Sequence, residues 1–257
     1  MSSAYSEINI SKIYEDFLPE LKSYLYRLTC DKEITNDLAQ DTFIKVIEKH
    51  NQFEGQSSIK TWIFSIATNL AIDWLRKRKR WSETAQDDAK ELAQSDATYR
   101  NTFLDIRQNS PNGAFDFKEH INFCFTCISK TLVIEQQVTL ILKDIYDFKV
   151  SEISRILSFP EGTIKHWLFV ARHTMTEIFD RRCALVSKEG VCYQCSELNG
   201  LFNPNQKRLK NVFPTADKEK LYELRAELVK AINPLDSKGS ELESSIMQVL
   251  RKAINDK

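Results

Sequence analysis

The chain has 257 residues with 36 basic and 36 acidic side chains, so its formal net charge is zero and it is no general polycation. Its six glycines are scattered, which excludes the Gly-rich phosphate loops of nucleotide-binding enzymes. No apolar run reaches the roughly 20 residues of a membrane span, and the N-terminus lacks a secretory signal, so we expect a cytoplasmic protein without a membrane span.

Helical periodicity dominates the chain and strand-like alternation is scarce, which predicts an all-α fold. The first helical pattern covers residues 12–29 and the second covers 32–49. The outer face of the second pattern carries acidic and amide side chains, namely Asp37, Gln40 and Asp41. A turn at 51–58 leads into the next helix.

Residues 59–80 form the central helical pattern, in which apolar side chains recur at three- and four-residue steps. The opposite face carries Thr61, Ser65 and Asn69, and five consecutive cations occupy positions 76–80. Short hydrogen-bonding groups followed by cations are typical of a helix that lies on nucleic acid. An ordinary amphipathic helix with a solvated basic end is the alternative interpretation.

A second helical unit follows a polar stretch that contains the turn sequence SPNG. We expect one helix over 134–146, a short helix capped by Ser151, a tight turn, and a longer helix over about 161–179. A short helix, a turn and a longer helix form the helix-turn-helix pattern, whose second helix enters the DNA major groove.

The cysteines suit metal or redox chemistry better than disulfides in a cytoplasmic protein. The candidate metal ligands are Cys124, Cys127, Cys183, Cys192 and Cys195. The two C-x2-C pairs could form a four-thiolate zinc site. The last three cysteines could instead bind zinc together with His173, or the thiols could be buried without metal.

The C-terminal part contains two further amphipathic patterns. The first covers 217–232, and its predicted inward residues are Leu221, Leu224, Leu228 and Ile232. The second has a capping box formed by Ser240 and Glu243. Because Phe169 and Val170 fall off the apolar stripe of the helix-turn-helix, we hypothesise that the extension docks on that unit and controls its access to DNA or polymerase.

Two separate stretches resemble one family. Residues 33–81, with the motif DLAQDTF, resemble region 2 of bacterial RNA polymerase sigma factors of the extracytoplasmic-function type, and residues 134–179 resemble region 4. The resemblance implies two helical domains on a flexible linker, a C-terminal helical extension, and a non-enzymatic role in transcription initiation. The implied limits are 1–81 for region 2, 82–118 for the linker, 119–182 for region 4 and 183–257 for the extension.

The resemblance also implies partners. Asp37, Gln40 and Asp41 match the positions that bind the β′ clamp of the polymerase core, and region 4 is expected at the β flap. Promoter DNA is the second partner, and an anti-sigma factor is a further partner that the family allows.

Region 2 of the family melts and reads the minus-ten element, and the loop at 51–58 resembles the one that receives a flipped base. The positions implied for the separated strand are Lys60, Thr61, Ser65, Asn69, Arg76, Arg78 and Trp81. Of the tryptophans, Trp81 lies beyond the apolar stripe and suits base stacking, whereas Trp62 and Trp74 suit core packing.

The helix-turn-helix of the family reads the minus-thirty-five element as duplex. The matching positions are Glu161, Thr163, Lys165, His166 and Arg172. The chain departs from the family here, because Trp167, Phe169 and Val170 stand where cations are usual. This predicts weak duplex affinity or a recognition helix covered by the extension.

Two other function classes fit the sequence less well. A stand-alone helix-turn-helix regulator would bind promoter DNA without polymerase and would not need the acidic surface at 37–41. A zinc deaminase needs H-x-E near P-C-x-x-C, and none of the histidines has a glutamate two residues later.

Overall fold

The computed structural model describes residues 10–82, 91, 95–97, 101, 117–182, 217–236, 247 and 251. Within these residues every regular element is helical, which confirms the predicted all-α class. In the same residues, no helix has the combination of length and apolar character needed to cross a membrane.

The first module consists of four helices: α1 (Ile10–Thr29), α2 (Lys32–Lys49), the 3-10 helix η1 (His50–Gln52) and α3 (Ile59–Arg76). Side-chain caps fix two of the starting points. The carboxylate of Asp31 accepts a hydrogen bond from the Ile34 N–H at 3.1 Å and begins α2. The hydroxyl of Ser58 accepts one from the Thr61 N–H at 3.0 Å and begins α3.

Helix α3 ends at Arg76, four residues before the predicted end at Arg80. Consecutive like charges disfavour a continued helix, and cations gain from the helix dipole only within the last turn. After Lys77 the chain leaves the helix, and the Arg80 guanidinium donates to the Leu132 carbonyl and to the Gln137 side chain. The hydrogen bonds of Arg80 to residues 132 and 137 therefore take the place of the last predicted turn of the helix.

The second module consists of α6 (Phe117–Ser129), α7 (Ile134–Asp144), α8 (Val150–Leu157) and α9 (Glu161–Arg182). The prediction that Ser151 caps α8 is wrong, because the cap residue is Lys149, whose N–H donates to the Glu152 carboxylate at 2.8 Å. Ser158 ends α8 in the left-handed region with φ 59° and turns the chain toward α9. The predicted helix-turn-helix is thus present as α8 and α9.

The described part of the extension is centred on α13 (Lys218–Lys230), capped by Asp217. Its buried residues are Tyr222, Arg225, Ala226 and Val229. The predicted inward face is correct only in part, because Leu228 packs against the core of the second module whereas Leu224 is 51% exposed. The most buried face carries Tyr222, which packs on Phe125, and Arg225, whose guanidinium lies over the Phe179 ring.

Part of the predicted extension lies outside the described residues. This applies to Cys183, Cys192 and Cys195, and to the capping box of Ser240 and Glu243. The corresponding predictions stay predictions.

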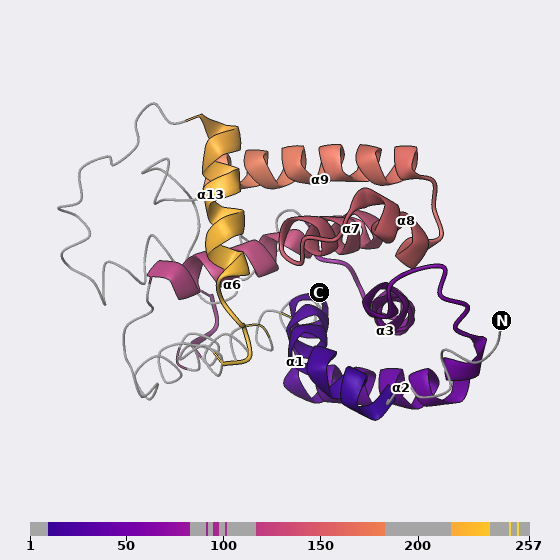
Figure 1. Ribbon diagram of the computed structural model, residues 1–257. Coiled ribbons are helices and arrows are strands. Elements are labelled where there is room, and N and C mark those ends of the chain that lie inside the picture. Colours follow the sequence, from indigo (N-terminus) through magenta and orange to yellow (C-terminus); the bar gives the residue numbers. More distant parts are fainter. Residues whose placement is uncertain are drawn as a thin grey trace.

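The two modules share a hydrophobic core. One cluster of buried residues joins α1, α2 and α3 to α7, α8 and α9, and a second joins α6, α7 and α9 to α13. Figure 1 shows α3 end-on between α2 and α8, with α13 crossing the end of α9 and reaching α6. The sequence had indicated two modules on a tether and gave no sign of this direct contact.

Candidate nucleic-acid and polymerase interfaces

The outer face of α2 is an acidic surface that remains open. Asp37, Gln40 and Asp41 are all exposed, as their three- and four-residue spacing predicts for one side of a helix. Ile44 and Ile47, at 46% and 45% exposure, lie close by on the same helix, and the sequence interpretation did not single them out. Acidic groups beside exposed aliphatic side chains suit a protein partner better than nucleic acid.

The predicted polar face of α3 divides into exposed and covered parts. Asn69 is exposed, so its amide can reach a ligand from solvent. Ser65 is half-buried, and its hydroxyl donates to the Trp62 carbonyl at 2.7 Å. Thr61 is only 1% exposed, and its hydroxyl bonds the Glu152 carboxylate of α8 at 3.2 Å.

The cation at the start of α3 is engaged by neighbouring helices. The Lys60 ammonium lies 2.7 Å from the Glu20 carboxylate of α1. It also lies over the rings of Phe64 and Phe148, at 5.6 Å and 5.1 Å from their centroids. A nucleic-acid phosphate would have to compete with this carboxylate and with an aromatic ring of the second module.

The basic end of α3 also contacts the second module. Arg76 lies 3.4 Å from Glu135 of α7, and Arg80 donates to Gln137 at 2.9 Å. Burial lowers the pKa of Arg80 to about 10, with the nearby Glu135 acting in the opposite direction. Arg78 instead stacks on Trp74 with 3.5 Å between its guanidinium carbon and the ring centroid.

Trp81 does not present a stacking surface in this structure. Its side chain is 8% exposed, and the ammonium of Lys130 lies 5.9 Å from its ring centroid. The sequence placed Trp81 outside the apolar stripe of α3 correctly, but the second module covers it. Trp62, by contrast, is half-buried and packs on Phe53 at 5.3 Å, in line with the expected structural role.

Helix α9 buries the predicted stripe and exposes the predicted reading face. The residues expected to point inward are all buried: Ile164, Leu168, Ala171, Met175, Ile178 and Phe179. Glu161, Lys165 and His166 are exposed, and Thr163 is half-buried. One side of α9 is thus packed into the core, and the predicted reading positions on it face solvent wholly or in part.

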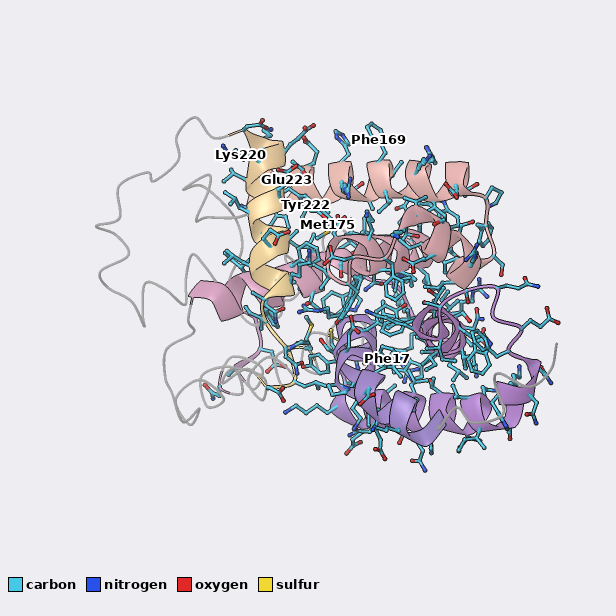
Figure 2. All side chains as sticks on the ribbon, viewed as in Figure 1. Phe17, Phe169, Met175, Lys220, Tyr222 and Glu223 are labelled. Carbon is cyan, nitrogen blue, oxygen red and sulfur yellow. The ribbon has the colours of Figure 1, made fainter. Side chains whose placement is uncertain are left out.

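Phe169 is the most exposed large apolar side chain among the described residues, at 71%. Its ring is stacked on that of His173 with 6.4 Å between centroids, and Figure 2 shows Phe169 on the outer side of α9. The described part of the extension does not cover it, because α13 packs elsewhere on the second module. Helix α13 therefore does not cover Phe169, and the expectation that the extension covers it stays a prediction about residues outside the described part.

Arg172 is held by an ion pair within the second module. Its guanidinium donates to both oxygens of Asp144, at 3.0 Å and 2.6 Å, and the Tyr222 hydroxyl of α13 donates to the same carboxylate at 2.7 Å. The hydrogen bond to Asp144 raises the pKa of Arg172. Through Tyr222, the extension thus acts directly on the ion pair that holds this predicted DNA contact.

The described cysteines do not form a metal site among themselves. Cys30, Cys124 and Cys127 are buried, and no group of three metal-ligating side chains occurs among the described residues. The alternative fourth ligand, His173, is exposed on α9 beside Phe169. A zinc site that includes Cys183, Cys192 and Cys195 stays a prediction about residues outside the described part.

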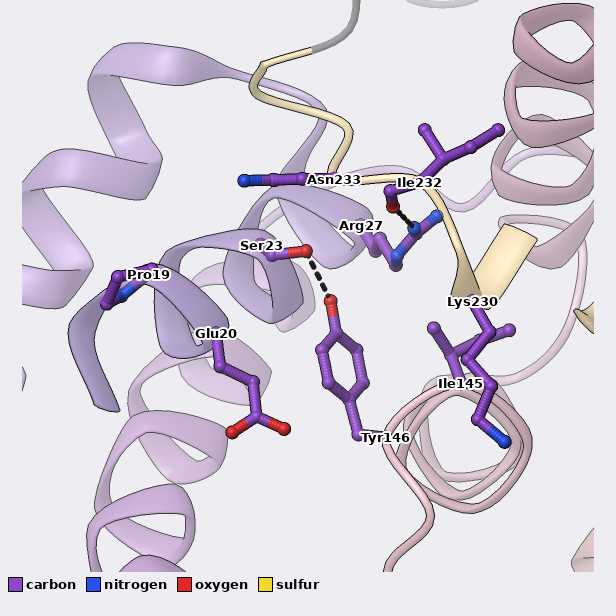
Figure 3. A pocket seen from close by; sticks show the side chains of 9 residues that line it. All are labelled: Pro19, Glu20, Ser23, Arg27, Ile145, Tyr146, Lys230, Ile232 and Asn233. Carbon is purple, nitrogen blue, oxygen red and sulfur yellow. Dashed lines mark hydrogen bonds between the residues drawn. The ribbon is translucent and has the colours of Figure 1, made fainter. Parts of the chain in front are cut away.

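A cavity of about 260 Å³ marks the place where α1, the end of α7 and the end of α13 meet (Figure 3). Its lining includes Arg27, which is 1% exposed and donates to the Val229 and Ile232 carbonyls at 2.8 Å and 2.6 Å. Across the cavity, the hydroxyls of Ser23 and Tyr146 are 2.8 Å apart. Polar contacts from three segments therefore converge on one seam.

Comparison with known proteins identifies relatives over more than half of the chain. The family model for sigma-70 region 2 matches residues 13–81. The ECF RNA polymerase sigma factor SigX of Bacillus subtilis is 26% identical over 181 residues, which cover 69% of this chain and 84% of SigX. SigW of the same organism, also an ECF RNA polymerase sigma factor, is 30% identical over 157 residues, which cover 61% of this chain and 80% of SigW.

Among solved structures, the sigma factor RpoE in complex with the anti-sigma factor NepR from Bartonella quintana is similar with a TM-score of 0.46. It shares 21% sequence identity, over 66% of this chain and 96% of that one.

Proposed function

The chain belongs to the extracytoplasmic-function (ECF) family of RNA polymerase sigma factors, and from this premise we propose which of its surfaces perform the steps of initiation. It is a transcription-initiation factor: it directs the polymerase core to promoters, while the core carries out the chemistry. The stand-alone regulator is not retained, because the match to region 2 covers the module that such a protein would lack.

The exposed face of α2 binds the polymerase clamp. Asp37, Gln40 and Asp41 are exposed together on a helix that lies inside the region 2 match, and this observation carries the proposal. Ile44 and Ile47 add apolar area at the edge of the same surface. The acidic side chains steer association with the clamp, and the two isoleucines supply apolar contact area.

Helix α3 holds the separated strand of the minus-ten element. Support comes from Asn69, which is exposed in the middle of the helix, and from the cations that flank it at Lys60, Arg76 and Arg78. An amide can read the edge of an unstacked base, while cations hold the backbone on either side.

Helix α9 contacts the minus-thirty-five element as duplex through Lys165, His166 and their neighbours. The exposed Phe169 supports a reading face that gains part of its affinity from apolar contact with a thymine methyl or sugar. Duplex affinity from this module alone is weak, because Arg172 is already bonded to Asp144.

The extension regulates the second module. Support comes from Tyr222, which packs against Phe125 and reinforces the pair of Asp144 with Arg172. The cysteine segment between α9 and α13 is the candidate sensor for metal or oxidant. Deleting 183–257 should change promoter-dependent transcription, with or without metal or oxidant; an unchanged response in every condition would contradict regulation by this segment.

Reconstitution with core polymerase tests the main proposal. The variant Asp37→Lys/Asp41→Lys should lose holoenzyme formation, measured by co-migration with core and by initiation on promoter DNA. The matched control is Glu15→Lys/Asp16→Lys, which reverses two exposed acids of α1 and should assemble normally. If the α2 variant assembled as well as the control, the assignment of the clamp surface would be wrong.

A further inference from the structure

We propose that the cavity between α1, the end of α7 and the end of α13 is a binding site for a small organic carboxylate. The cavity has a volume of about 260 Å³. Since a water molecule takes about 30 Å³ in the liquid, this space suits a ligand of roughly eight non-hydrogen atoms. The inference goes beyond the proposed function and does not depend on it, because none of the lining residues is a proposed DNA or polymerase contact.

The buried charge of Arg27 is the observation that points to an anion. Arg27 lines the cavity, and its side chain is 1% exposed. Its guanidinium donates to the Asn122 side-chain oxygen at 2.6 Å and to the carbonyls of Val229 and Ile232. These acceptors are uncharged, so the described residues supply Arg27 with no carboxylate partner. A buried charge without a counterion is costly, and an anion in the cavity reduces that cost.

Hydrogen-bond donors remain available around this charge. The Nε–H of Arg27 and the Nδ2 amide group of Asn122 are buried and meet no acceptor among the described residues. The hydroxyls of Ser23 and Tyr146, both in the cavity lining, are 2.8 Å apart. Two hydroxyls that share one hydrogen bond leave one O–H hydrogen for a further acceptor. A carboxylate accepts several hydrogen bonds at once and so matches this set of donors.

The apolar part of the lining favours an organic acid over an inorganic anion. Pro19, Ile145 and Ile232 belong to the same lining, and Figure 3 shows them in one group with Arg27. A ligand with an apolar body and one carboxylate can contact these side chains while its charge faces the guanidinium. Small-molecule sites combine apolar walls with a few polar groups in this way. Inorganic phosphate would leave the apolar walls without contact.

The two charged side chains at the rim are compatible with an anion. The Glu20 carboxylate lies 2.7 Å from the Lys60 ammonium, which offsets its charge. The Lys230 ammonium lies 2.6 Å from the Asp147 carboxylate, and the Asp147 side chain is 67% exposed. Ion pairs with an exposed partner are weak, so Lys230 can exchange Asp147 for a ligand carboxylate at small cost.

The lining comes from three segments, and this gives ligand binding a structural consequence. Helix α1 supplies Arg27, the residue pair after α7 supplies Tyr146, and α13 supplies Lys230. A ligand that contacts all three stabilises their docked arrangement by mass action. The contact of the extension with α1 therefore becomes sensitive to the concentration of an organic acid.

Isothermal titration calorimetry with the full-length protein tests the site. The probes are benzoate, its neutral isostere benzamide, the flexible acid hexanoate, and inorganic phosphate, all at one ionic strength. At least one of the two acids should bind with a dissociation constant on the order of 1 mM, as expected for ligands of this size. Benzamide should bind about tenfold more weakly than benzoate, because it lacks the charge that pairs with Arg27.

Two substitutions locate the site. Arg27→Met should reduce the affinity for the acid about tenfold or more, with circular dichroism as the check of folding. Lys230→Met should reduce it about threefold, the value of a weak ion pair. The matched control is Lys220→Met, which makes the same change at an exposed position of the same helix and should bind like wild type. Lys230 is only half-buried, so its variant decides the test if Arg27→Met does not fold.

Hydrogen exchange adds a readout of position. The bound acid should slow amide exchange in α13, whereas benzamide at the same concentration should not. If neither acid bound, or if Lys230→Met bound like Lys220→Met, the site would be wrong. Binding without slower exchange in α13 would place the ligand elsewhere and overturn the proposal. Phosphate that bound as tightly as the acids would overturn the assignment to an organic ligand.

Discussion

Burial changes the ionisation of individual side chains, and Tyr14 of α1 is the clearest case. Its hydroxyl donates to the Ala39 carbonyl, its ring packs on Phe43 at 4.6 Å, and burial raises the pKa of Tyr14 to about 12. The unfolded chain ionises near 10, so the folded state disfavours the phenolate. The neutral Tyr14 hydroxyl therefore contributes to the free energy of unfolding in full below pH 10. This contribution is lost as the pH rises through 12.

Replacing Tyr14 with phenylalanine should make the protein less sensitive to alkali. Between pH 8 and pH 11 the wild type should lose about 1.4 kcal/mol more free energy of unfolding than Tyr14→Phe. Urea titrations of both proteins at the two pH values measure the difference. Between pH 6 and pH 8 the difference in free energy of unfolding between the two proteins should stay constant. If both proteins lost the same free energy of unfolding up to pH 11, Tyr14 would not be the group responsible.

Among the elements, α3 carries the most specific functional prediction. Asn69 and Asp73 are both exposed and lie one turn apart, so they form a matched pair on one helix. Asn69→Ala should reduce promoter opening five- to 100-fold, roughly the value of one base contact, while Asp73→Ala should not reduce it. Permanganate reactivity of unpaired thymines measures opening, and equal effects of the two substitutions would remove Asn69 from the reading role.

The boundaries and inner faces of most elements could be predicted because they follow from short-range periodicity. The starts of α2 and α3 at Asp31 and Ser58 follow from local capping, and the stripe of α9 from Ile164 onward follows from its spacing. What could not be predicted depends on distant partners. Arg80 leaves the helix to reach Gln137, and Trp81 is covered by the second module.

The inward face of α13 could be predicted only in part, for a related reason. Leucine spacing correctly indicated Leu228, but the receiving surface presents aromatic rings, so Tyr222 is buried and Leu224 is exposed. The candidate reading positions on α3 and α9 could be predicted because they lie outside the core. Their engagement by Glu135 and Glu152 could not, since nothing in the sequence links these glutamates to α3.

At the scale of the whole molecule, the shared core should make the two modules unfold as one unit. The cluster that joins α1, α2 and α3 to the second module contains Phe148 near its centre. Independent modules would show two thermal transitions, whereas a common core should give one.

The substitution Phe148→Ala should cost about 3–5 kcal/mol of the free energy of unfolding and should separate calorimetric melting into two transitions. The control is Phe169→Ala, which removes an exposed phenylalanine and should change stability by about 0.5 kcal/mol or less. Two transitions already present in the wild type would show that the seam does not couple the modules.

Arg27 has a consequence for how the protein is made. Its carbonyl acceptors follow it by 202 and 205 positions in the sequence. At about 5–20 residues per second, a ribosome needs roughly 10–40 s to add them after α1 has been synthesised. A nascent polypeptide therefore carries this guanidinium without those acceptors for most of its translation, and a product cut short before Val229 never obtains them.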